Sequence, residues 1–345
     1  MNNFFQNHTS KNVFIIAELS ANHNGSLKNA IETVRAAKRA GADAIKLQTY
    51  TADTITIDSK KEDFIINNGS IWDGKNFYEL YQEAFTPWEW HKKLFKVAKE
   101  EGLICFSSPF DFTAVDFLEK LNVPCYKIAS FEITDIPLIE YVASKGKPII
   151  LSTGIAQKSD IELALSTIRN TGNNEIALLK CTSSYPAPIE EANLKMIQDF
   201  EDRFNVITGL SDHTLGIISP IVAVSLGAKL IEKHLILDKK IGGPDAFFSL
   251  DEKEFTEMVT HVRNAEKAIG VISYKLTEKQ KEGRNFSRSL YVITDVKKGD
   301  KVSPDNVKSI RPGFGMHPKK LPEIIGKVFI KDVEFGTALK QIHIE

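Results

Sequence analysis

The chain has 345 residues, which is long enough for one domain of about 250 residues and a smaller second module. It carries 44 Lys and Arg against 45 Asp and Glu, so no overall field attracts nucleic acid or an anionic membrane. Residues 1–10 are polar without a basic and apolar leader pattern, and no apolar run approaches the ~20 residues of a membrane span. These features predict a soluble, cytoplasmic protein that binds neither nucleic acid nor membrane.

Short apolar runs alternate with longer stretches of helical periodicity up to Gly270. The predicted strands are residues 12–19, 44–48, 103–109, 125–130, 148–153, 175–182, 206–212 and 229–235. The predicted helices are residues 26–41, 87–102, 111–121, 136–146, 158–170, 191–204, 216–227 and 250–270. Eight apolar strands joined by helical crossovers close most simply as a (β/α)8 TIM barrel of the α/β class. An open doubly wound sheet is the alternative.

Two segments depart from this alternation. Residues 51–85 are polar and too long for an ordinary loop, which predicts a lid or substrate wall over the barrel mouth. After Gly270 a polar stretch precedes short strand-like runs with turn residues. The predicted domains are a barrel over 1–270, a linker over 271–287 and a small β-rich domain over 288–345. This last domain is too small to bury a large core alone, so we expect it to lean on another surface, such as a partner subunit.

Cysteine and tryptophan are interpreted as packing residues. Cys105, Cys125 and Cys181 lie inside apolar runs without paired spacing, which predicts reduced core thiols. Trp88 and Trp90 are interpreted, with the third tryptophan of the chain, as helix-packing side chains. Neither residue type is expected to carry the chemistry.

All eight predicted strands end in polar side chains. In a (β/α)8 barrel the active site is built at the carboxyl ends of the strands, so these side chains converge on one rim. The principal members of this rim are Glu18, Lys46, Gln48, Ser107, Ser108, Lys127, Ser130, Ser152, Thr153, Thr182, Ser183, Tyr185, Ser211, Asp212, His213, Glu232, Lys233 and His234. Eight polar strand ends predict an active site and are hard to explain by solvation.

His213 and His234 end adjacent strands, where period-two geometry can aim both imidazoles at one point. Two imidazoles with open positions suit a divalent Lewis-acid metal. Glu18, Asp245 and Glu232 are available as additional ligands or to hold water. A hydrogen-bonded structural role for each histidine is the alternative.

Lys46 and Lys127 lie inside otherwise apolar strands, where an unpaired ammonium is costly, so each is expected to face an anion. A phosphate plus a carboxylate would satisfy both. Five hydroxyls are candidate donors to the same anion, those of Ser107, Ser130, Ser152, Ser183 and Ser211. The alternative is a pair of lysines that snorkel to solvent.

Two carboxylates approach the mouth as candidates for proton transfer. Glu132 lies two residues beyond Ser130, and Glu18 precedes the loop SANHNG. The alternative for Glu132 is a carboxylate that favours a helix dipole. Which carboxylate moves protons is left open.

Nine ordered motifs span almost the whole chain: AELSANHNGSL, AIKLQTY, CYKIASFEITD, PIILSTG, LLKCTSSYP, GLSDHTLG, EKH, GGPDAFFSL and RPGFG. Together they resemble the sialic acid synthase family. The resemblance implies a (β/α)8 barrel followed by a small domain similar to type III antifreeze protein, a SAF domain. It also implies an enzyme that condenses phosphoenolpyruvate with an amino-sugar aldehyde.

The resemblance further implies roles for individual residues. His213 and His234 would bind the catalytic divalent metal, which is manganese, magnesium or cobalt. Phosphoenolpyruvate would be held by Lys46, Lys127, Ser130, Ser152, Ser183 and Ser211. The sugar and the bond-forming centre would be faced by Glu18, Glu132, Tyr185 and Asp245. Arg311, in RPGFG, would reach the active site of the partner in a domain-swapped homodimer.

Two motifs depart from the pattern of many family members. Where neuraminate and legionaminate synthases read something like GPDHKASL, this chain loses the histidine and gains Phe247 and Phe248. The loop resembles the pseudaminic acid branch, whose sugar, 2,4-diacetamido-2,4,6-trideoxy-L-altrose, carries a methyl group that two rings would suit. Ser183 stands where neuraminate synthases often have Asn, which leaves its ligand open.

The sequence therefore predicts a phosphoenolpyruvate-dependent sugar-acid synthase of the pseudaminic type. Synthesis of N-acetylneuraminate or legionaminate is the alternative within the family. A Schiff-base aldolase, with Lys127 or Lys180 as nucleophile, would need no metal. A sugar-binding regulatory protein that keeps the barrel is the non-enzymatic alternative.

Overall fold

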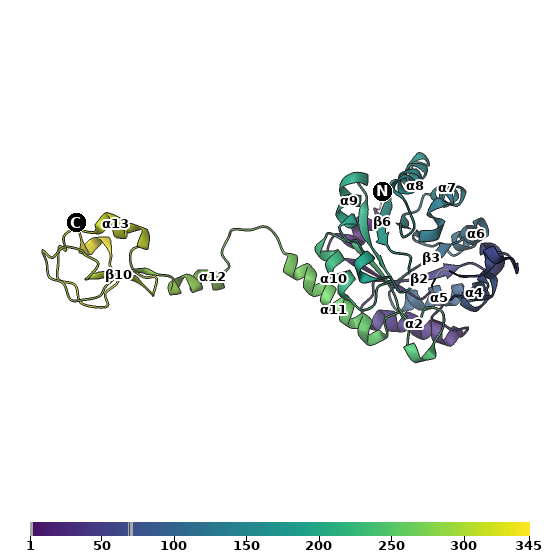
Figure 1. Ribbon diagram of the computed structural model, residues 1–345, viewed down its shortest axis with the longest axis horizontal. Coiled ribbons are helices and arrows are strands. Elements are labelled where there is room, and N and C mark those ends of the chain that lie inside the picture. The colour runs from purple at the N-terminus through teal and green to yellow at the C-terminus, as the bar shows by residue number, and fades with distance from the viewer. Residues whose placement is uncertain (1–2, 68, 70–71) are drawn as a thin grey trace. The chain divides into compact units, whose positions relative to one another are not determined.

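The computed structural model describes residues 3–67, 69 and 72–345, and the chain divides into two compact units, Met1–Gly270 and Val271–Glu345. The first unit contains a closed barrel of eight parallel strands in chain order (Figure 1). The strands are β1 (Phe14–Glu18), β2 (Ala44–Thr49), β3 (Ile104–Pro109), β4 (Tyr126–Ile128), β5 (Ile149–Ser152), β6 (Ile176–Cys181), β7 (Ile207–Asp212) and β8 (Leu230–His234). Each strand lies inside a predicted run or extends past it by one residue. The predicted (β/α)8 barrel is confirmed, and the open doubly wound sheet is wrong.

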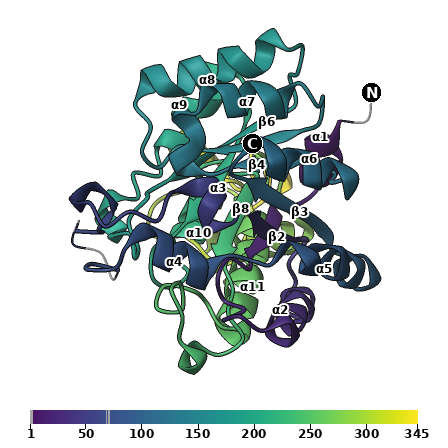
Figure 2. The same ribbon diagram turned by 90° about the vertical axis from the view of Figure 1, so that its right-hand side faces the viewer.

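All eight predicted crossover helices are present, and they surround the strands (Figure 2). They are α2 (Leu27–Arg39), α5 (Trp88–Glu100), α6 (Phe112–Lys120), α7 (Ile136–Ala143), α8 (Lys158–Asn170), α9 (Met196–Phe204), α10 (Ile218–Ser225) and α11 (Glu252–Ile269). Local sequence fixes their starts: Ser26 accepts a hydrogen bond from Asn29 N, and Asp251 forms a capping box with Glu254. Within the described residues, no helix combines the length and hydropathy needed to cross a bilayer.

Helix α9 begins five residues later than predicted. A 3-10 turn, Ile189–Glu191, and Asn193, whose φ is 45°, occupy the preceding residues. A left-handed residue interrupts α-helical hydrogen bonding, so the amphipathic pattern over residues 191–195 does not continue the helix.

The amino-terminal helix α1 (Phe4–Thr9) was not predicted from the polar residues 1–10. Asn3 caps it by accepting a hydrogen bond from Gln6 N, and Phe5 is buried. Phe5 packs in one apolar cluster with the inward-facing side chains of the lower barrel: Phe14, Ile16, Ala44, Phe106, Cys125, Ile150, Ala177, Leu179 and Leu230. Helix α1 therefore closes the amino-terminal end of the barrel.

The predicted lid segment, residues 51–85, contains α3 (Ala52–Ile55), a 3-10 turn (Glu62–Phe64) and α4 (Phe77–Ala84). Asn68, Ser70 and Ile71 of this segment lie outside the described residues. The indole Nε1 of Trp72 donates to Pro244 O over 3.2 Å, and its ring centroid is 5.3 Å from that of Tyr185. The segment thus reaches the loops that follow β6 and β8, at the barrel mouth.

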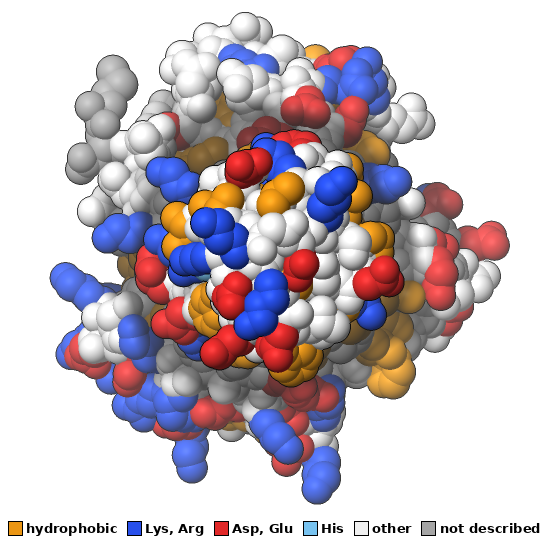
Figure 3. All heavy atoms as spheres, turned by 90° about the vertical axis from the view of Figure 1, so that its left-hand side faces the viewer, with side chains coloured by type: hydrophobic (Ala, Val, Ile, Leu, Met, Phe, Trp, Pro, Cys, Tyr) orange, Lys and Arg blue, Asp and Glu red, His pale blue; other side chains and the backbone are white. Residues whose placement is uncertain are grey.

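The second unit is a small, mainly irregular β domain. Its strands β9 (Ser289–Val292) and β10 (Val307–Ile310) pair antiparallel, and its short helices are α12 (Glu278–Gly283) and α13 (Leu321–Ile324). A core of its own includes Leu290, Val292, Phe329 and Leu339, all fully buried. Figure 3 shows hydrophobic side chains exposed among charged ones. The exposed apolar side chains of the second unit include Phe286, Phe314, Phe335 and Ile342. The expectation that this domain leans on another surface stays a prediction.

Candidate active site at the carboxyl end of the barrel

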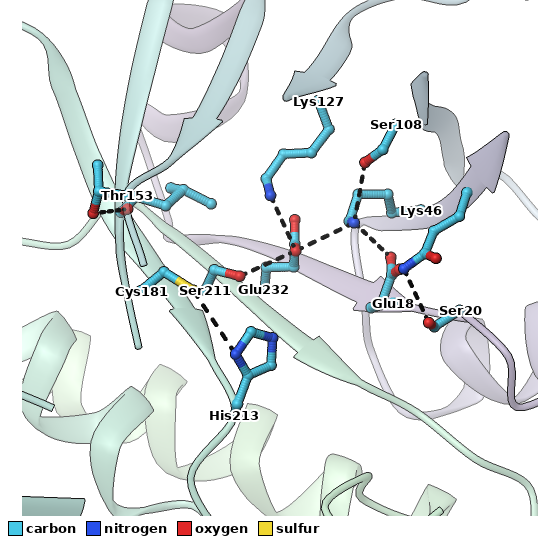
Figure 4. A network of polar contacts seen from close by, with 12 residues as sticks. Glu18, Ser20, Lys46, Ser108, Lys127, Thr153, Cys181, Ser211, His213 and Glu232 are labelled. Atoms are coloured by element: carbon cyan, nitrogen blue, oxygen red, sulfur yellow. Dashed lines mark hydrogen bonds and ion pairs between the residues drawn. The ribbon is translucent and has the colours of Figure 1, made fainter. Parts of the chain in front are cut away.

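Strand alternation turns polar side chains from all eight strands into the upper barrel interior, above the apolar cluster. Figure 4 shows many of them pointing toward one another. The inward set is Glu18, Lys46, Gln48, Ser108, Lys127, Ser152, Cys181, Ser211, Glu232 and His234. The predicted convergence of strand ends is therefore present in the described residues.

An ion cluster lies at the centre of this set (Figure 4). Lys46 Nζ is 3.0 Å from Glu18 Oε2 and 3.4 Å from Glu232 Oε1, and Lys127 Nζ is 3.5 Å from the same Glu232 oxygen. Gln48 Nε2 donates to Glu18 Oε1 over 2.8 Å. The two lysines are almost fully buried, so the alternative that they snorkel to solvent is wrong. The anions that face them here are protein carboxylates.

The four charged groups shift one another's pKa values. Burial raises the pKa of Glu18, whereas the two ammonium groups outweigh burial at Glu232 and lower its pKa. Burial lowers the pKa of Lys127, whereas at Lys46 the two carboxylates outweigh burial and raise the pKa. Glu232 is thus the shared counter-ion of both lysines, a stronger role than the auxiliary one predicted from sequence.

Hydroxyl groups without partners lie beside this cluster. Ser130 Oγ and Ser152 Oγ are buried and accept or donate no hydrogen bond among the described residues. At Gly154 a Cβ atom would lie 2.1 Å from Ser183 Oγ and 2.5 Å from Ser130 Oγ, so only glycine fits between them. Ser211 Oγ donates to Glu232 Oε1 over 3.2 Å. Buried hydroxyls that find no protein partner indicate a place for a ligand with acceptor oxygens.

Ser107 does not belong to this group, and its predicted role as an anion donor is wrong. Its Oγ is 2.7 Å from Thr49 Oγ1, which is 2.9 Å from His91 Nε2 on α5. Because side chains alternate along β3, Ser107 faces the helices and Ser108 faces Lys46, over 3.4 Å.

His213 and His234 lie side by side, with ring centroids 5.3 Å apart. His213 Nδ1 is 3.0 Å from Thr182 O, and donation to that carbonyl leaves the Nε2 lone pair for another ligand. His234 Nδ1 is buried, has no hydrogen-bond partner in the described part of the chain and lies 3.7 Å from Asp245 Oδ2. Burial and the nearby His213 lower the pKa of His234 well below its ordinary value, which keeps this ring neutral.

These two imidazoles fit a divalent metal whose other ligands are water and substrate. One ring has an orphaned nitrogen, and the other is oriented by a backbone carbonyl, as metal-bound histidines usually are. No group of three or more His, Cys, Asp or Glu side chains that could hold a metal occurs within residues 3–67, 69 and 72–345. The protein alone therefore offers an open, two-histidine site.

Aromatic side chains pack directly on the histidine pair. Phe248 is 1% exposed, and its ring centroid is 4.9 Å from His234 and 5.3 Å from Tyr185. Tyr185 in turn lies 4.5 Å from His213. Phe247 is instead 61% exposed. The two neighbouring phenylalanines therefore differ in position, a difference that sequence alone did not predict.

Two further carboxyl groups border the site. Glu132 lies in a 3-10 turn (Ser130–Thr134), and burial raises its pKa to about 7. Its Oε2 has no partner among the described residues. Burial also raises the pKa of Asp245, whose Oδ2 accepts a hydrogen bond from Ala21 N over 3.3 Å. Both groups have properties expected of carboxyls that exchange protons or bind substrate.

Arg311 directly follows β10 in the second unit and is exposed. Its predicted approach to the site of a partner subunit therefore stays a prediction.

The chain resembles known proteins along nearly its whole length. Residues 33–274 match the NeuB family, and residues 287–345 match the SAF domain. A pseudaminic acid synthase of Campylobacter jejuni is 51% identical, over 96% of this chain and 97% of its own. A pseudaminic acid synthase of Helicobacter pylori is 48% identical, over 96% and 97%. The crystal structure of the N-acetylneuraminic acid (sialic acid) synthetase of Leptospira borgpetersenii, in complex with citrate, superposes with a TM-score of 0.71 at 32% identity, covering 79% of this chain and 90% of the other. The chain therefore belongs to the NeuB family of sugar-acid synthases and carries a SAF domain at its carboxyl-terminal end.

Proposed function

We propose that this chain is a pseudaminic acid synthase, which condenses phosphoenolpyruvate with 2,4-diacetamido-2,4,6-trideoxy-L-altrose and releases phosphate. The observation that carries the proposal is the buried cluster of Lys46, Lys127 and Glu232 beside the His213–His234 pair. Near-complete alignment at 51% identity with a named pseudaminic acid synthase supports this product over neuraminate, whose synthetase is 32% identical.

Lys46 and Lys127 would hold the phosphate and carboxylate of phosphoenolpyruvate. Two ammonium groups in a buried site stabilise an anion far more than in water. The unpartnered hydroxyls of Ser130 and Ser152, with Ser183 and Ser211, would donate hydrogen bonds to the same oxygens. Glu232 would then keep the lysines in place without neutralising both.

His213 and His234 would hold the divalent ion, for which manganese, magnesium and cobalt are the candidates. When bound, this ion supplies Lewis-acid polarisation of the aldehyde oxygen of the sugar. In the reaction, the methylene carbon of phosphoenolpyruvate bonds to the aldehyde carbon and water adds to C2. The bond from C2 to the phosphate oxygen then breaks, which leaves a nine-carbon 2-oxo acid.

Proton transfer would fall to the carboxyls at the rim. The raised pKa of Glu132, about 7, allows it to take the proton of the attacking water near neutral pH. Glu18 is a second candidate, although it already accepts a hydrogen bond from Gln48 and pairs with Lys46. Tyr185 and Asp245 would face the sugar, with Phe247 and Phe248 near its methyl group.

A Schiff-base mechanism has less support. Lys180 Nζ donates to Cys181 O over 2.5 Å and to Thr182 Oγ1 over 3.1 Å, on a side chain that alternates with the inward Cys181. Lys127 is inward, but it is the counter-ion of Glu232. Borohydride trapping with substrate should therefore label neither lysine, whereas a trapped adduct would favour the aldolase.

The direct test is incubation of the purified enzyme with phosphoenolpyruvate, Mn²⁺ and each candidate sugar. We expect phosphate release and a 2-oxo acid of the expected mass with the trideoxy-altrose sugar. Faster turnover with N-acetylmannosamine or the legionaminate precursor would make the chain an N-acetylneuraminate or legionaminate synthase instead. No turnover with any sugar would favour a sugar-binding regulatory protein.

We also propose a domain-swapped homodimer in which Arg311 completes the partner's site. In support of this proposal, the second unit carries 15 Lys and Arg against 9 Asp and Glu, whereas the first carries 29 against 36, so the two units have net charges of opposite sign. Combining Arg311→Ala and His234→Ala chains, each inactive alone, should restore activity in mixed dimers. No recovery despite demonstrated subunit exchange would remove Arg311 from the partner's site.

A further inference from the structure

Lys233 is a fully buried charge that the proposed reaction does not use. It lies on β8 between Glu232 and His234, both of which face the barrel interior. Because side chains alternate along a strand, the ammonium of Lys233 points to the opposite side, toward the surrounding helices. Its side chain is 0% exposed. A buried ammonium requires a counter-charge and hydrogen-bond acceptors close by.

Asp212 supplies that counter-charge from the neighbouring strand β7. The two residues are direct partners in the β7–β8 register, and Lys233 Nζ is 2.5 Å from Asp212 Oδ2. Lys233 Nζ also donates to Thr214 O. The other oxygen of Asp212, Oδ1, accepts from Thr214 N over 3.0 Å and from Thr214 Oγ1 over 2.8 Å. Both charges in this group are thus paired, and Asp212 accepts hydrogen bonds at both of its oxygens.

This network binds the residues on both sides of His213 in the chain. Asp212 and Thr214, the residues before and after His213, are both bound to Lys233. Thr214 Oγ1 also bonds Ser219 Oγ on α10, over 3.0 Å. On the other side, Ala187 N donates to His213 O over 3.0 Å. The backbone that carries His213 is therefore fixed to β8, the strand that ends in His234.

The energetics favour a geometric role over a stabilising one. A buried ion pair gains little net stability over well-packed apolar side chains, because desolvation of both charges offsets their attraction. What the pair provides is a directional link of fixed length. Here that link joins the strands that carry the two histidines.

We infer that Lys233 and Asp212 are positioning residues that hold His213 at the distance from His234 required for a shared divalent ion. The inference rests on the proposed metal site. Outer groups that orient metal-binding histidines typically change metal affinity 10- to 100-fold when they are removed.

The test measures Mn²⁺ binding without substrate, by the electron paramagnetic resonance signal of the free ion. Three variants are compared with the parent: Lys233→Met, Asp212→Asn and the double variant, which leaves no unpaired charge. We expect the double variant to stay folded and to bind Mn²⁺ at least about 10-fold more weakly than the parent. Lys233→Met should bind equally weakly and unfold at a lower temperature, because it leaves Asp212 buried and unpaired.

Arg263→Met provides a matched control. Arg263 Nη2 lies 3.1 Å from Asp43 Oδ2 and Nη1 donates to Val13 O, at residues that precede β1 and β2. This variant should lower the unfolding temperature and leave Mn²⁺ affinity within about 2-fold of the parent.

Parental Mn²⁺ affinity in a folded double variant would overturn the positioning role and leave the metal site intact. A parent chain that binds no Mn²⁺ would overturn the metal site itself and the inference with it. Equal weakening by Arg263→Met would show that affinity follows general stability, which would also overturn the positioning role.

Discussion

The lower and upper halves of the barrel interior are lined by the same eight strands and are both buried, yet the lower half is apolar and the upper half is polar and charged. In the lower half Phe14, Ile16, Phe106 and Ile150 are fully or almost fully buried, and Phe5 of α1 closes the end. In the upper half the same strands end in an ion cluster, unpartnered hydroxyls and two histidines. The comparison teaches that stability and chemistry occupy opposite ends of the same elements.

Buried side chains in the two halves contribute to the free energy of folding with opposite signs. Each large apolar side chain buried below contributes roughly 1.5–3 kcal/mol to folding. Each buried polar group left without a partner above costs about 1–3 kcal/mol. Substitutions in the lower half should therefore lower stability, whereas those in the upper half should lower turnover without lowering stability.

The largest expected effect is loss of turnover from the upper half. Removing the divalent ion with a chelator, or replacing both histidines in His213→Ala/His234→Ala, should lower kcat/KM by about 10³- to 10⁴-fold, because Lewis-acid stabilisation is worth several kcal/mol. Added Mn²⁺ should restore the chelated parent and fail to restore the variant. Steady-state phosphate release measures both. Full activity in metal-stripped enzyme would sink the proposed metal site.

A substitution below should show the reverse behaviour. Phe106→Ala removes a fully buried ring from the apolar cluster and should lower the free energy of unfolding by about 3–5 kcal/mol. Phe106 lies opposite Lys46 in the β2–β3 register, but its apolar ring can make no ion pair with the cluster, so kcat/KM per folded molecule should stay within about 3-fold of the parent. Urea unfolding and the phosphate assay measure the two quantities. A large loss of kcat/KM at full folding would show that the halves are coupled.

The fold was predictable because its signals are local and repeated. Apolar runs and amphipathic stretches placed every barrel strand and crossover helix. Helix α1 was missed because six residues with two phenylalanines carry too little periodicity, and its place is fixed only by the open end of the barrel. Such a tertiary cause leaves no local pattern.

The rim could be predicted as a set, but not the partners within it. Strand ends indicated the lysines and histidines, whereas the pairing of both lysines with Glu232 depends on three strands meeting. Ser107 and Ser108 look alike in sequence, and only the strand register separates them. Gly154 was missed because the close approach of Ser130 and Ser183 is long-range. The interpretation of Trp72 as a helix-packing side chain was wrong, because its contact with Pro244 is also long-range. Unlike Trp88 and Trp90 on α5, Trp72 lies in a turn.

The pH profile offers a smaller test of the upper half. Burial raises the pKa of Glu132 to about 7, so below this pH the carboxyl is protonated and cannot accept a proton. We expect kcat/KM to rise with pH through about 7. Glu132→Gln should lower kcat/KM about 100-fold and abolish this rise with pH. If kcat/KM of the variant still rose with pH through about 7, another group would be responsible for the rise. If kcat/KM of the parent fell with pH instead, Glu132 would act as an acid.

The carboxyl of Glu132 should also make the stability of the parent fall with pH, whereas kcat/KM rises with pH. Its folded-state pKa lies above its unfolded value, so the parent loses stability as pH rises from about 4.5 through about 7. Glu132→Gln lacks this loss and should unfold at a higher temperature than the parent at pH 8, by a few degrees. Thermal unfolding at pH 5 and pH 8 measures the difference, which should be much smaller at the lower pH.

The smallest expected effect separates two adjacent residues of the upper rim. A sugar methyl group can be buried only against an apolar surface that is accessible, and Phe247 is 61% exposed whereas Phe248 is 1% exposed. Burying a methyl contributes roughly 1 kcal/mol, so Phe247→Ala should reduce the preference for the trideoxy sugar over N-acetylmannosamine about 5- to 10-fold. Phe248 packs on His234 and Tyr185, so Phe248→Ala should lower kcat/KM for both sugars alike and keep their ratio. Specificity constants for both sugars in the parent and the two variants decide the matter. An unchanged ratio in Phe247→Ala would mean that its ring meets some other surface, and a changed ratio in Phe248→Ala would place the buried ring at the sugar.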